Sequence, residues 1–194
     1  EASIPLTFRP GDYAMEEARD GCSRITMKED GYFCHGSTGQ PALPAKTFNV
    51  LVQHDIDWST LKLEVVATQS AQLKGTWRIA PVGPVAGANG ICVNGQAAGV
   101  NGAGGLSPGE CVALLPHGNM RQYAFARVLF SPFRFDPATG GLFLTEGVTV
   151  RLSYRRNAGP GNALKSDPVL RGEAQRLACN EEQARAAGWY RDAE

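Results

Sequence analysis

A succession of short β-type segments is the feature that most restricts the possible folds of this chain. Each segment alternates apolar and polar residues, or runs apolar with β-branched side chains, and turn-like residues separate it from the next. With no helical periodicity between them, the segments predict a mainly β fold, an antiparallel β-sandwich. The segments are Ser23–Lys28, Thr47–Gln53, Leu61–Thr68, Leu73–Ala80, Cys111–Leu115, Gln122–Phe130, Gly141–Leu144 and Val148–Tyr154.

Two local pairings follow from this pattern. We expect the three segments between Thr47 and Ala80 to be antiparallel neighbours, since only short turns connect them. The last two segments, on either side of Thr145–Gly147, are predicted to form a hairpin.

The last thirty residues or so have a different, helical pattern. Apolar residues recur at helical spacing from Leu170 to Ala178, and Asn180–Gln183 resembles a capping box that would begin a short second helix ending at Gly188. We therefore divide the chain into a β-sandwich body, residues 1–156, and a linker with a short C-terminal helical tail, residues 157–194.

A glycine-rich stretch, Pro84–Glu110, interrupts the β pattern. Its 27 residues include eight glycines and contain no Lys, no Arg and no aromatic ring, so we expect neither strand nor helix there. Structureless connections of this length in a compact domain are usually lids, binding loops or disordered linkers. Because β-type sequence lies on both sides, we interpret the stretch as a functional loop that orders on a partner.

Charge argues against two classes of partner. The chain carries 19 basic and 19 acidic residues, a net charge of zero, so it has no electrostatic footprint for nucleic acid or for an anionic membrane surface. The sequence also has no run of 18 apolar residues, so no membrane insertion is predicted.

The five cysteines suit two disulfides, Cys22–Cys34 and Cys92–Cys111, with Cys179 left over. Such pairing predicts an oxidising compartment. The alternative use of cysteines is metal binding, but the chain has no CxxC or HxxxH motif. We therefore predict neither a metal site nor a cofactor.

Catalytic motifs are missing from the sequence. The three histidines are isolated from one another, and only His54, beside Asp55 and Asp57, has carboxylates near it that could orient a base. The same residues also suit a solvated loop between two strands. With no nucleophile or metalloprotease motif, the sequence indicates a chain that is not an enzyme by itself.

Six short blocks follow one another along the chain: Gly39–Pro44, Leu63–Val66, Arg78–Pro81, Ser107–Glu110, Phe130–Gly140 and Leu144–Val150. Physically the blocks look like turns and strand ends, because their prolines and glycines preset or permit particular backbone angles. In this order the blocks resemble the N-terminal propeptide of gingipain-type (family C25) cysteine peptidases. The resemblance spans about residues 37–155.

This resemblance implies an inhibitory and folding-assisting propeptide, a zymogen prodomain whose partner is the catalytic domain of a C25-like cysteine peptidase. In that family a loop after the Ile-Ala-Pro strand end occludes the active-site cleft and presents a substrate-like residue to the S1 pocket. Here that position falls within the glycine-rich loop, where the substrate-mimic candidates are Ala88, Asn89, Cys92 and Asn94, with Asn101 also available. Asn-Gly pairs also make ordinary turns, which is the plainer interpretation of each Asn. The absence of a basic residue argues against a partner specific for Arg or Lys.

The resemblance also implies a secreted, cell-surface or periplasmic bacterial protein whose prodomain is removed by proteolysis. Arg191 and Glu194 are the processing-site candidates, unless Glu194 is an arbitrary boundary. Two rival functions remain from the residues alone. One is a carbohydrate-binding or adhesion β-sandwich that would use Trp58, Trp77 and Tyr123, and the other is a hydrolase that would use His54 and a cysteine.

Overall fold

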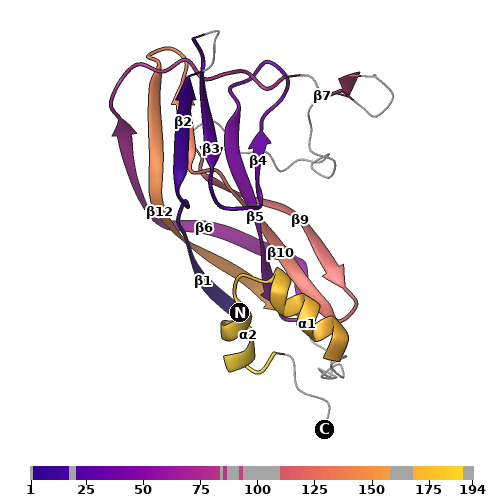
Figure 1. The fold of residues 1–194 in the computed structure, drawn as a ribbon. Coiled ribbons are helices and arrows are strands. Elements are labelled where there is room, and N and C mark those ends of the chain that lie inside the picture. Colours follow the sequence, from indigo (N-terminus) through magenta and orange to yellow (C-terminus); the bar gives the residue numbers. More distant parts are fainter. Residues whose placement is uncertain are drawn as a thin grey trace.

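The computed structural model describes residues 2–17, 21–83, 85–86, 92–93, 110–157 and 168–189, and of 85–86, 92–93 and 168 only the backbone (Figure 1). The described chain is mainly β, with two short helices at its C-terminal end. The strands are β1 Ala2–Phe8, β2 Tyr13–Glu17, β3 Ser23–Met27, β4 Tyr32–His35, β5 Leu43–Val52, β6 Ile56–Leu73, β7 Val85–Ala86, β8 Cys92–Val93, β9 Val112–Met120, β10 Tyr123–Phe130, β11 Phe133–Asp136 and β12 Gly141–Arg156, and the helices are α1 Pro168–Leu177 and α2 Glu181–Ala186.

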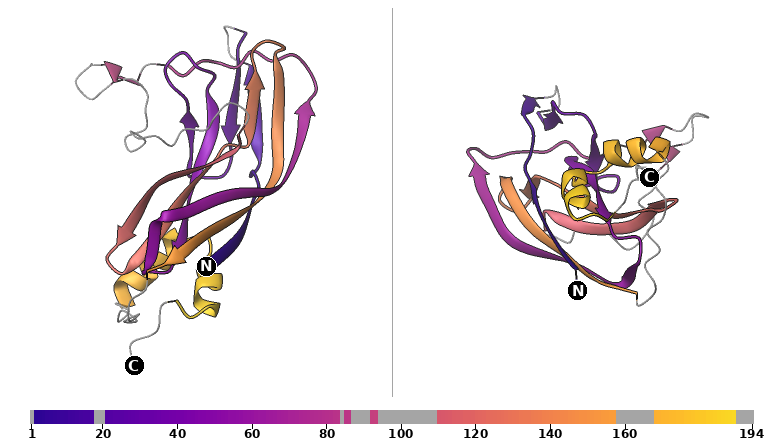
Figure 2. Two further views of the ribbon diagram at one scale, coloured as in Figure 1. Left: turned by 180° about the vertical axis from the view of Figure 1, so that it is seen from behind. Right: turned by 90° about the horizontal axis from the view of Figure 1, so that it is seen from below.

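Two four-stranded antiparallel sheets form the body. In the first sheet β6 pairs with one edge of β12, while β1 and β11 pair with successive parts of its other edge. The second sheet has the order β4–β5–β10–β9. The three views in Figures 1 and 2 show the two sheets facing each other, with the helices at one end.

The main core lies between the two sheets. Along β12 the buried side chains alternate with more exposed ones, as expected for a strand with one face inward. β10 is buried on both faces, because its second face is covered too, by the helices at one end and by a small cluster at the other. Buried residues of the main core include Ile4, Leu6 and Phe8 of β1, Val50 and Val52 of β5, Ala126, Val128 and Phe130 of β10, and Val148, Val150, Leu152 and Tyr154 of β12.

A second, smaller core closes the other end of the sandwich. Ile79, Phe133 and Leu142 are buried there beneath the two-stranded hairpin of β2 and β3, which contributes side chains such as Met15 and Ile25. This cluster lies next to the segment that leads into the glycine-rich loop.

The mainly β class, the antiparallel sheets and the two short C-terminal helices confirm the predicted fold. Three local predictions are wrong. β5 and β6 lie in different sheets, so the three segments between Thr47 and Ala80 are not neighbours, and residues 74–80 form only an isolated bridge, between Ile79 and Ser23. β12 runs unbroken through Thr145–Gly147, where a register shift in its pairing with β6 replaces the expected turn. Within the glycine-rich stretch, β7 and β8 form a two-residue ladder.

Candidate functional site

Two segments connect the glycine-rich loop to the sandwich, and we call them the first root, residues 78–82, and the second root, residues 110–112. The first root lies between two other segments. On one side Ser23 donates to Arg78 (2.7 Å) and accepts from Ala80 (3.0 Å) through backbone groups. On the other side the segment 39–42 pairs with it in antiparallel fashion. The root is therefore held along both edges.

The prolines of two sequence blocks oppose each other in this pairing, Pro41 against Pro81. The flanking backbone bonds run from Ala42 N–H to Ala80 O (2.9 Å) and from Val82 N–H to Gln40 O (2.7 Å). In such a pair the two central residues need no N–H of their own, so proline costs no hydrogen bond there. The structure thus brings together the blocks Gly39–Pro44 and Arg78–Pro81, which we had interpreted as separate turns and strand ends.

Ser131 fixes the second root and connects it to β5. Its backbone N–H donates to Cys111 O (2.8 Å), and its hydroxyl lies 3.1 Å from Pro44 O and 3.3 Å from Phe133 O, both acceptors. Ser131 is buried, so these bonds are shielded from water. A third sequence block, Phe130–Gly140, therefore also contributes to holding the loop.

The turn within that block is confirmed. Asp136 accepts hydrogen bonds from Ala138 N–H (3.0 Å) and from the Thr139 hydroxyl (2.8 Å), and Gly140 has φ +66°. Gly140 O in turn accepts from Trp77 N–H (2.8 Å), which ties the turn to the chain just before the first root.

The substrate-mimic candidates Ala88, Asn89, Asn94 and Asn101 lie outside the described residues, as does the side chain of Cys92. Their proposed roles remain predictions. The processing-site candidates Arg191 and Glu194 also lie outside the described residues.

No disulfide is formed among the cysteines whose side chains the structure describes, which are Cys22, Cys34, Cys111 and Cys179. The side chain of Cys92 lies outside the described residues. Cys22 is buried just before Ser23, which bridges to Ile79, whereas Cys34 lies on β4 beside Pro44 of the second sheet. The two cysteines predicted as a pair therefore belong to different packing units.

None of the thiols with a shifted pKa is activated as a nucleophile. Burial raises the pKa of Cys34 and Cys111, and raises that of Cys179 to about 11. A nucleophilic cysteine needs the opposite shift. His35 follows Cys34 on the same strand, so their side chains point to opposite faces of the sheet and do not form a pair.

The carboxylates near His54 are used elsewhere. Arg156 Nε donates to both carboxylate oxygens of Asp55, Oδ1 at 3.0 Å and Oδ2 at 2.8 Å, and Arg156 Nη2 forms an ion pair with Oδ2 at 2.6 Å. These bonds lower the pKa of Asp55. Asp57 accepts from the Ser59 backbone and hydroxyl. Both carboxylates stabilise the connection between β5 and β6, so the hydrolase interpretation loses its orienting groups.

The aromatic platform of the carbohydrate-binding alternative is not formed. Tyr123 is buried under the helices, Trp77 packs in the small core, and Trp58 stacks on His117 with ring centroids 4.1 Å apart. The three rings belong to three different clusters. They present no common surface to a sugar.

The helical tail is docked on the free edge of β5 by a side chain that imitates a strand. Asn180 Oδ1 accepts from Leu51 N–H (2.8 Å) and its Nδ2 donates to Leu51 O (3.0 Å), while Cys179 N–H donates to Asn49 O (2.9 Å). Asn180 makes no capping bond to α2, so the predicted capping box is wrong. Its amide satisfies the backbone of β5 instead.

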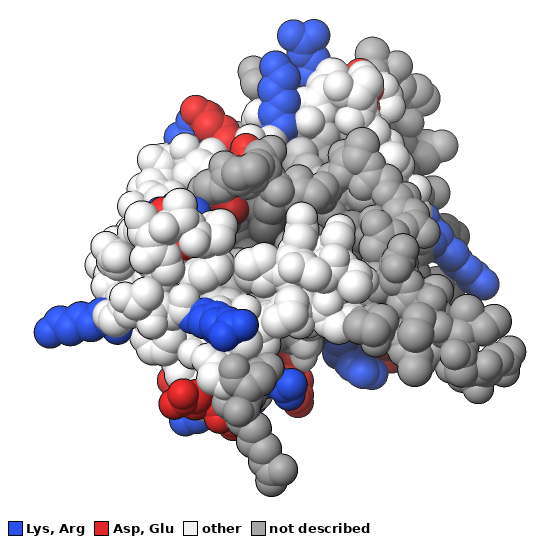
Figure 3. All heavy atoms as spheres, turned by 90° about the horizontal axis from the view of Figure 1, so that it is seen from above, with Lys and Arg blue, Asp and Glu red and all other residues white. Residues whose placement is uncertain are grey.

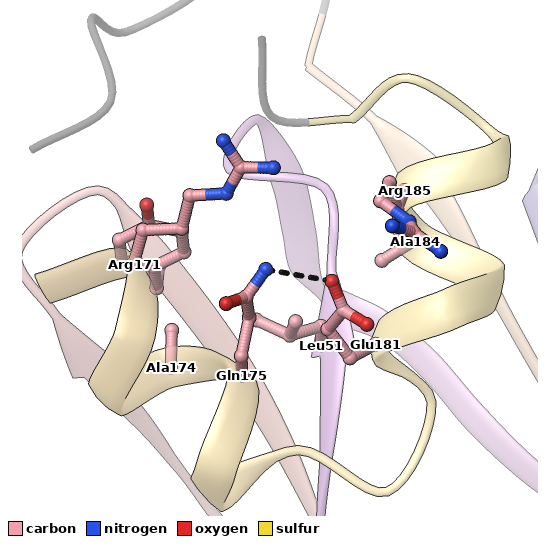
Figure 4. Close-up of a pocket in the computed structure, with 8 residues that line it drawn as sticks. Leu51, Arg171, Ala174, Gln175, Glu181, Ala184 and Arg185 are labelled. Carbon is pink, nitrogen blue, oxygen red and sulfur yellow. Dashed lines mark hydrogen bonds between the residues drawn. The ribbon is translucent and has the colours of Figure 1, made fainter. Parts of the chain in front are cut away.

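Between the two helices lies a hollow over Leu51 (Figure 4). Gln175 of α1 donates from Nε2 to Glu181 Oε1 of α2 across it at 2.8 Å, and Arg171 and Arg185 extend on either side. This bond joins the two helices. Together with Asn180 it makes the tail part of the packed molecule.

Seen from above, uncharged side chains occupy the middle of the described surface, and charged ones lie mostly around its margin (Figure 3). Among the described residues no group of three or more His, Cys, Asp and Glu side chains is placed to hold a metal ion. None of the described helices is long and apolar enough to cross a membrane.

These features define a β-sandwich that holds both ends of a long loop and in which burial raises the pKa of Cys34, Cys111 and Cys179. The family model Propeptide_C25 matches residues 4–172. The chain therefore belongs to the C25 propeptide family and is the non-catalytic prodomain of a cysteine peptidase zymogen.

Two solved structures from Porphyromonas gingivalis share the fold. A chain in the complex of RgpB pro- and mature domains is 19% identical with a TM-score of 0.68, over 94% of this chain and 93% of that one. A chain in a structure on the zymogenic latency of gingipain K is 17% identical with a TM-score of 0.57, over 80% of this chain and 88% of that one. No curated protein matches the chain.

Proposed function

We propose that this prodomain inhibits and helps to fold a secreted gingipain-like cysteine peptidase, whose active-site cleft it occludes with the loop 84–110 until it is cut away. The observation that carries the proposal is the double anchoring of that loop. Both roots are held by backbone hydrogen bonds to a packed sandwich, and Ser131 connects the second root to β5. The family assignment and the solved prodomain complex of RgpB support the same function.

The anchoring has an energetic consequence for binding. Ordering a residue's backbone costs about 1–2 kcal/mol, so a long glycine-rich loop loses much of its binding energy when it becomes fixed on a partner. Fixed roots lower the part of this cost that comes from bringing the loop ends together. A rigid sandwich with two pinned roots is therefore a suitable carrier for a loop that must enter a cleft.

The loop composition bears on the partner's specificity. No Lys or Arg occurs between Pro81 and Met120, so the peptidase that accepts this loop prefers a small or amide side chain in its S1 pocket. Asn89 is the first candidate for that position, followed by Asn94, while Ala88 offers a small side chain. Cys92 offers a thiol that could approach the catalytic cysteine.

Removal of the prodomain requires an exposed cleavage point after the tail. We propose Arg191 or Glu194 for that point. We also propose that the protein is a secreted, cell-surface or periplasmic bacterial protein, and the family assignment supports this location.

The test uses the cognate C25-like cysteine peptidase, assayed with a peptide library to find its preferred substrate. The isolated chain should inhibit it, and Asn89→Ala, Asn94→Ala or deletion of 95–105 should weaken inhibition at least about tenfold, or about 1.4 kcal/mol. Gln96→Ala, in the same loop, serves as the matched control and should have little effect. Full peptidase activity in saturating prodomain would refute the proposal, and equal inhibition by all variants would make the loop a spacer.

A further inference from the structure

The turn at Gly36–Gln40 is shaped around the last residue of the first root, Val82. Val82 both donates to Gln40 O (2.7 Å) and accepts from Gly39 N–H (3.0 Å). The turn is closed on itself, because Gln40 N–H donates to Ser37 O (2.9 Å) and Ser37 N–H donates to Gln40 Oε1 (3.0 Å). Thus one closed turn holds both backbone polar groups of Val82.

Two glycines make this contact possible. Gly39 has φ +86° and Gly36 has φ +133°, both in the region that favours glycine. A Cβ on Gly36 would lie 3.3 Å from Val82 Cγ2 and 3.4 Å from Pro41 O. The side chain of Val82 is itself buried, so it has little freedom to move away.

We propose that the Gly36–Gln40 turn is a positioning element for the inhibitory loop, and that Gly39 sets the direction in which the chain leaves the sandwich. This inference rests on the proposed inhibitory function. Only Gly83 separates Val82 from the loop, so a rotation of the Val82 peptide groups changes where the loop begins. A rigid exit direction lowers the entropy that the loop loses on binding.

A merely structural role for Gly39 would predict only a loss of stability. The chain offers a matched control in Gly31, whose φ is +88° and whose added Cβ would meet only the flexible end of Lys46, at 3.4 Å. An added Cβ on Gly39 would meet nothing within 4 Å. The two Gly→Ala variants therefore carry similar strain in φ, but only at position 39 does the strained residue donate its N–H to Val82 O. Relief of the strain by a change in φ therefore moves this bond in Gly39→Ala.

The experiment compares the inhibition constants and melting temperatures of the wild-type chain, Gly39→Ala and Gly31→Ala against the cognate peptidase. We expect similar melting temperatures for the two variants, with inhibition weakened about tenfold by Gly39→Ala and less than about threefold by Gly31→Ala. Equal inhibition constants for the two variants would overturn the positioning role. A wild-type chain that does not inhibit would instead overturn the proposed function, so the two failures are distinguishable.

A second set of variants decides the matter if Gly39→Ala does not fold. Gly36→Ala places a methyl against Val82, and Val82→Ala removes the atom that this methyl would meet. We expect Gly36→Ala to weaken inhibition more in the wild-type background than in the Val82→Ala background. Identical effects in both backgrounds, that is, no coupling in the cycle, would contradict the inference.

Discussion

Replacement of Asn180 by Ala tests the docking of the helical tail most directly. The side chain is buried and makes both of its hydrogen bonds to one residue, Leu51, which is itself only 3% exposed. Each bond contributes about 0.5–1.5 kcal/mol, and a buried backbone group left without a partner costs about 1–3 kcal/mol. With two such groups exposed to partial rehydration, we expect the tail to lose about 2–4 kcal/mol of docking free energy.

The loss should be local, because the main core does not depend on Asn180. Native-state hydrogen exchange measures it through the amides of Leu51 and Cys179, which donate to Asn180 and Asn49. A loss of 2 kcal/mol corresponds to about 30-fold faster exchange. The amides of β10 should keep their protection, since they open only with the whole sandwich.

Asn49→Ala is the matched control, because Asn49 lies on the same contact but makes only one long side-chain bond, 3.5 Å to Leu177 O. We expect it to accelerate exchange less than about threefold. Similar exchange of the Leu51 amide in Asn180→Ala and in the wild-type chain would refute the argument that this side chain replaces a neighbouring strand. Faster exchange throughout β10 would show instead that the tail and the sandwich unfold together.

Three further predictions concern stability and the thiols. Leu152→Ala, in the main core, should lower the free energy of unfolding by about 2–5 kcal/mol in urea titrations, and an unchanged midpoint would contradict its burial between the sheets. Arg156 lowers the pKa of Asp55 in the folded chain, so the pair stabilises the fold at pH values above 3.8, the ordinary pKa of Asp, and this contribution is lost as the pH falls below it. Asp55→Asn should therefore lower the free energy of unfolding by about 0.5–1 kcal/mol at pH 7 and have no effect once the carboxyl is protonated. Unfolding measured over an acid titration will show this difference. Burial raises the pKa of Cys179 to about 11, so only about one thiol in a thousand is ionised at pH 8. The rate of Cys179 alkylation should therefore rise about tenfold per pH unit up to pH 11. A rate that levels off near pH 9 would contradict this.

Local sequence patterns predicted the strand content well because alternation reports directly on which face of a strand is buried. The burial of Val148, Val150 and Leu152 in β12 is the clearest case. The same patterns failed at Thr145–Gly147, where a bulge and a turn have similar composition. They also missed β1, although Ile4, Leu6 and Phe8 alternate along it with more exposed residues. They missed β2 as well, whose residues do not alternate clearly and which is fixed by its pairing with β3.

The site was only partly predictable, for a related reason. Gly39–Pro44 and Arg78–Pro81 were identified as separate blocks, but nothing local indicated that Pro41 and Pro81 oppose each other. Asn180 looked like a helix cap because its spacing to Gln183 suits one, yet an open strand edge at Leu51 bound its amide instead. In both cases the partner is distant in sequence.

The sequence by itself determined the β class, the helical tail, the unusual glycine-rich stretch and, through its ordered blocks, the family to which the chain belongs. These follow from local propensity, residue period and block order, all of which are written along the chain. Only the tertiary structure decided that β5 and β6 belong to different sheets, that Cys22 and Cys34 form no disulfide, and that both roots of the loop are held by backbone bonds. Such outcomes depend on which strand edges and buried polar groups meet after folding, and that is a property of contacts between distant segments.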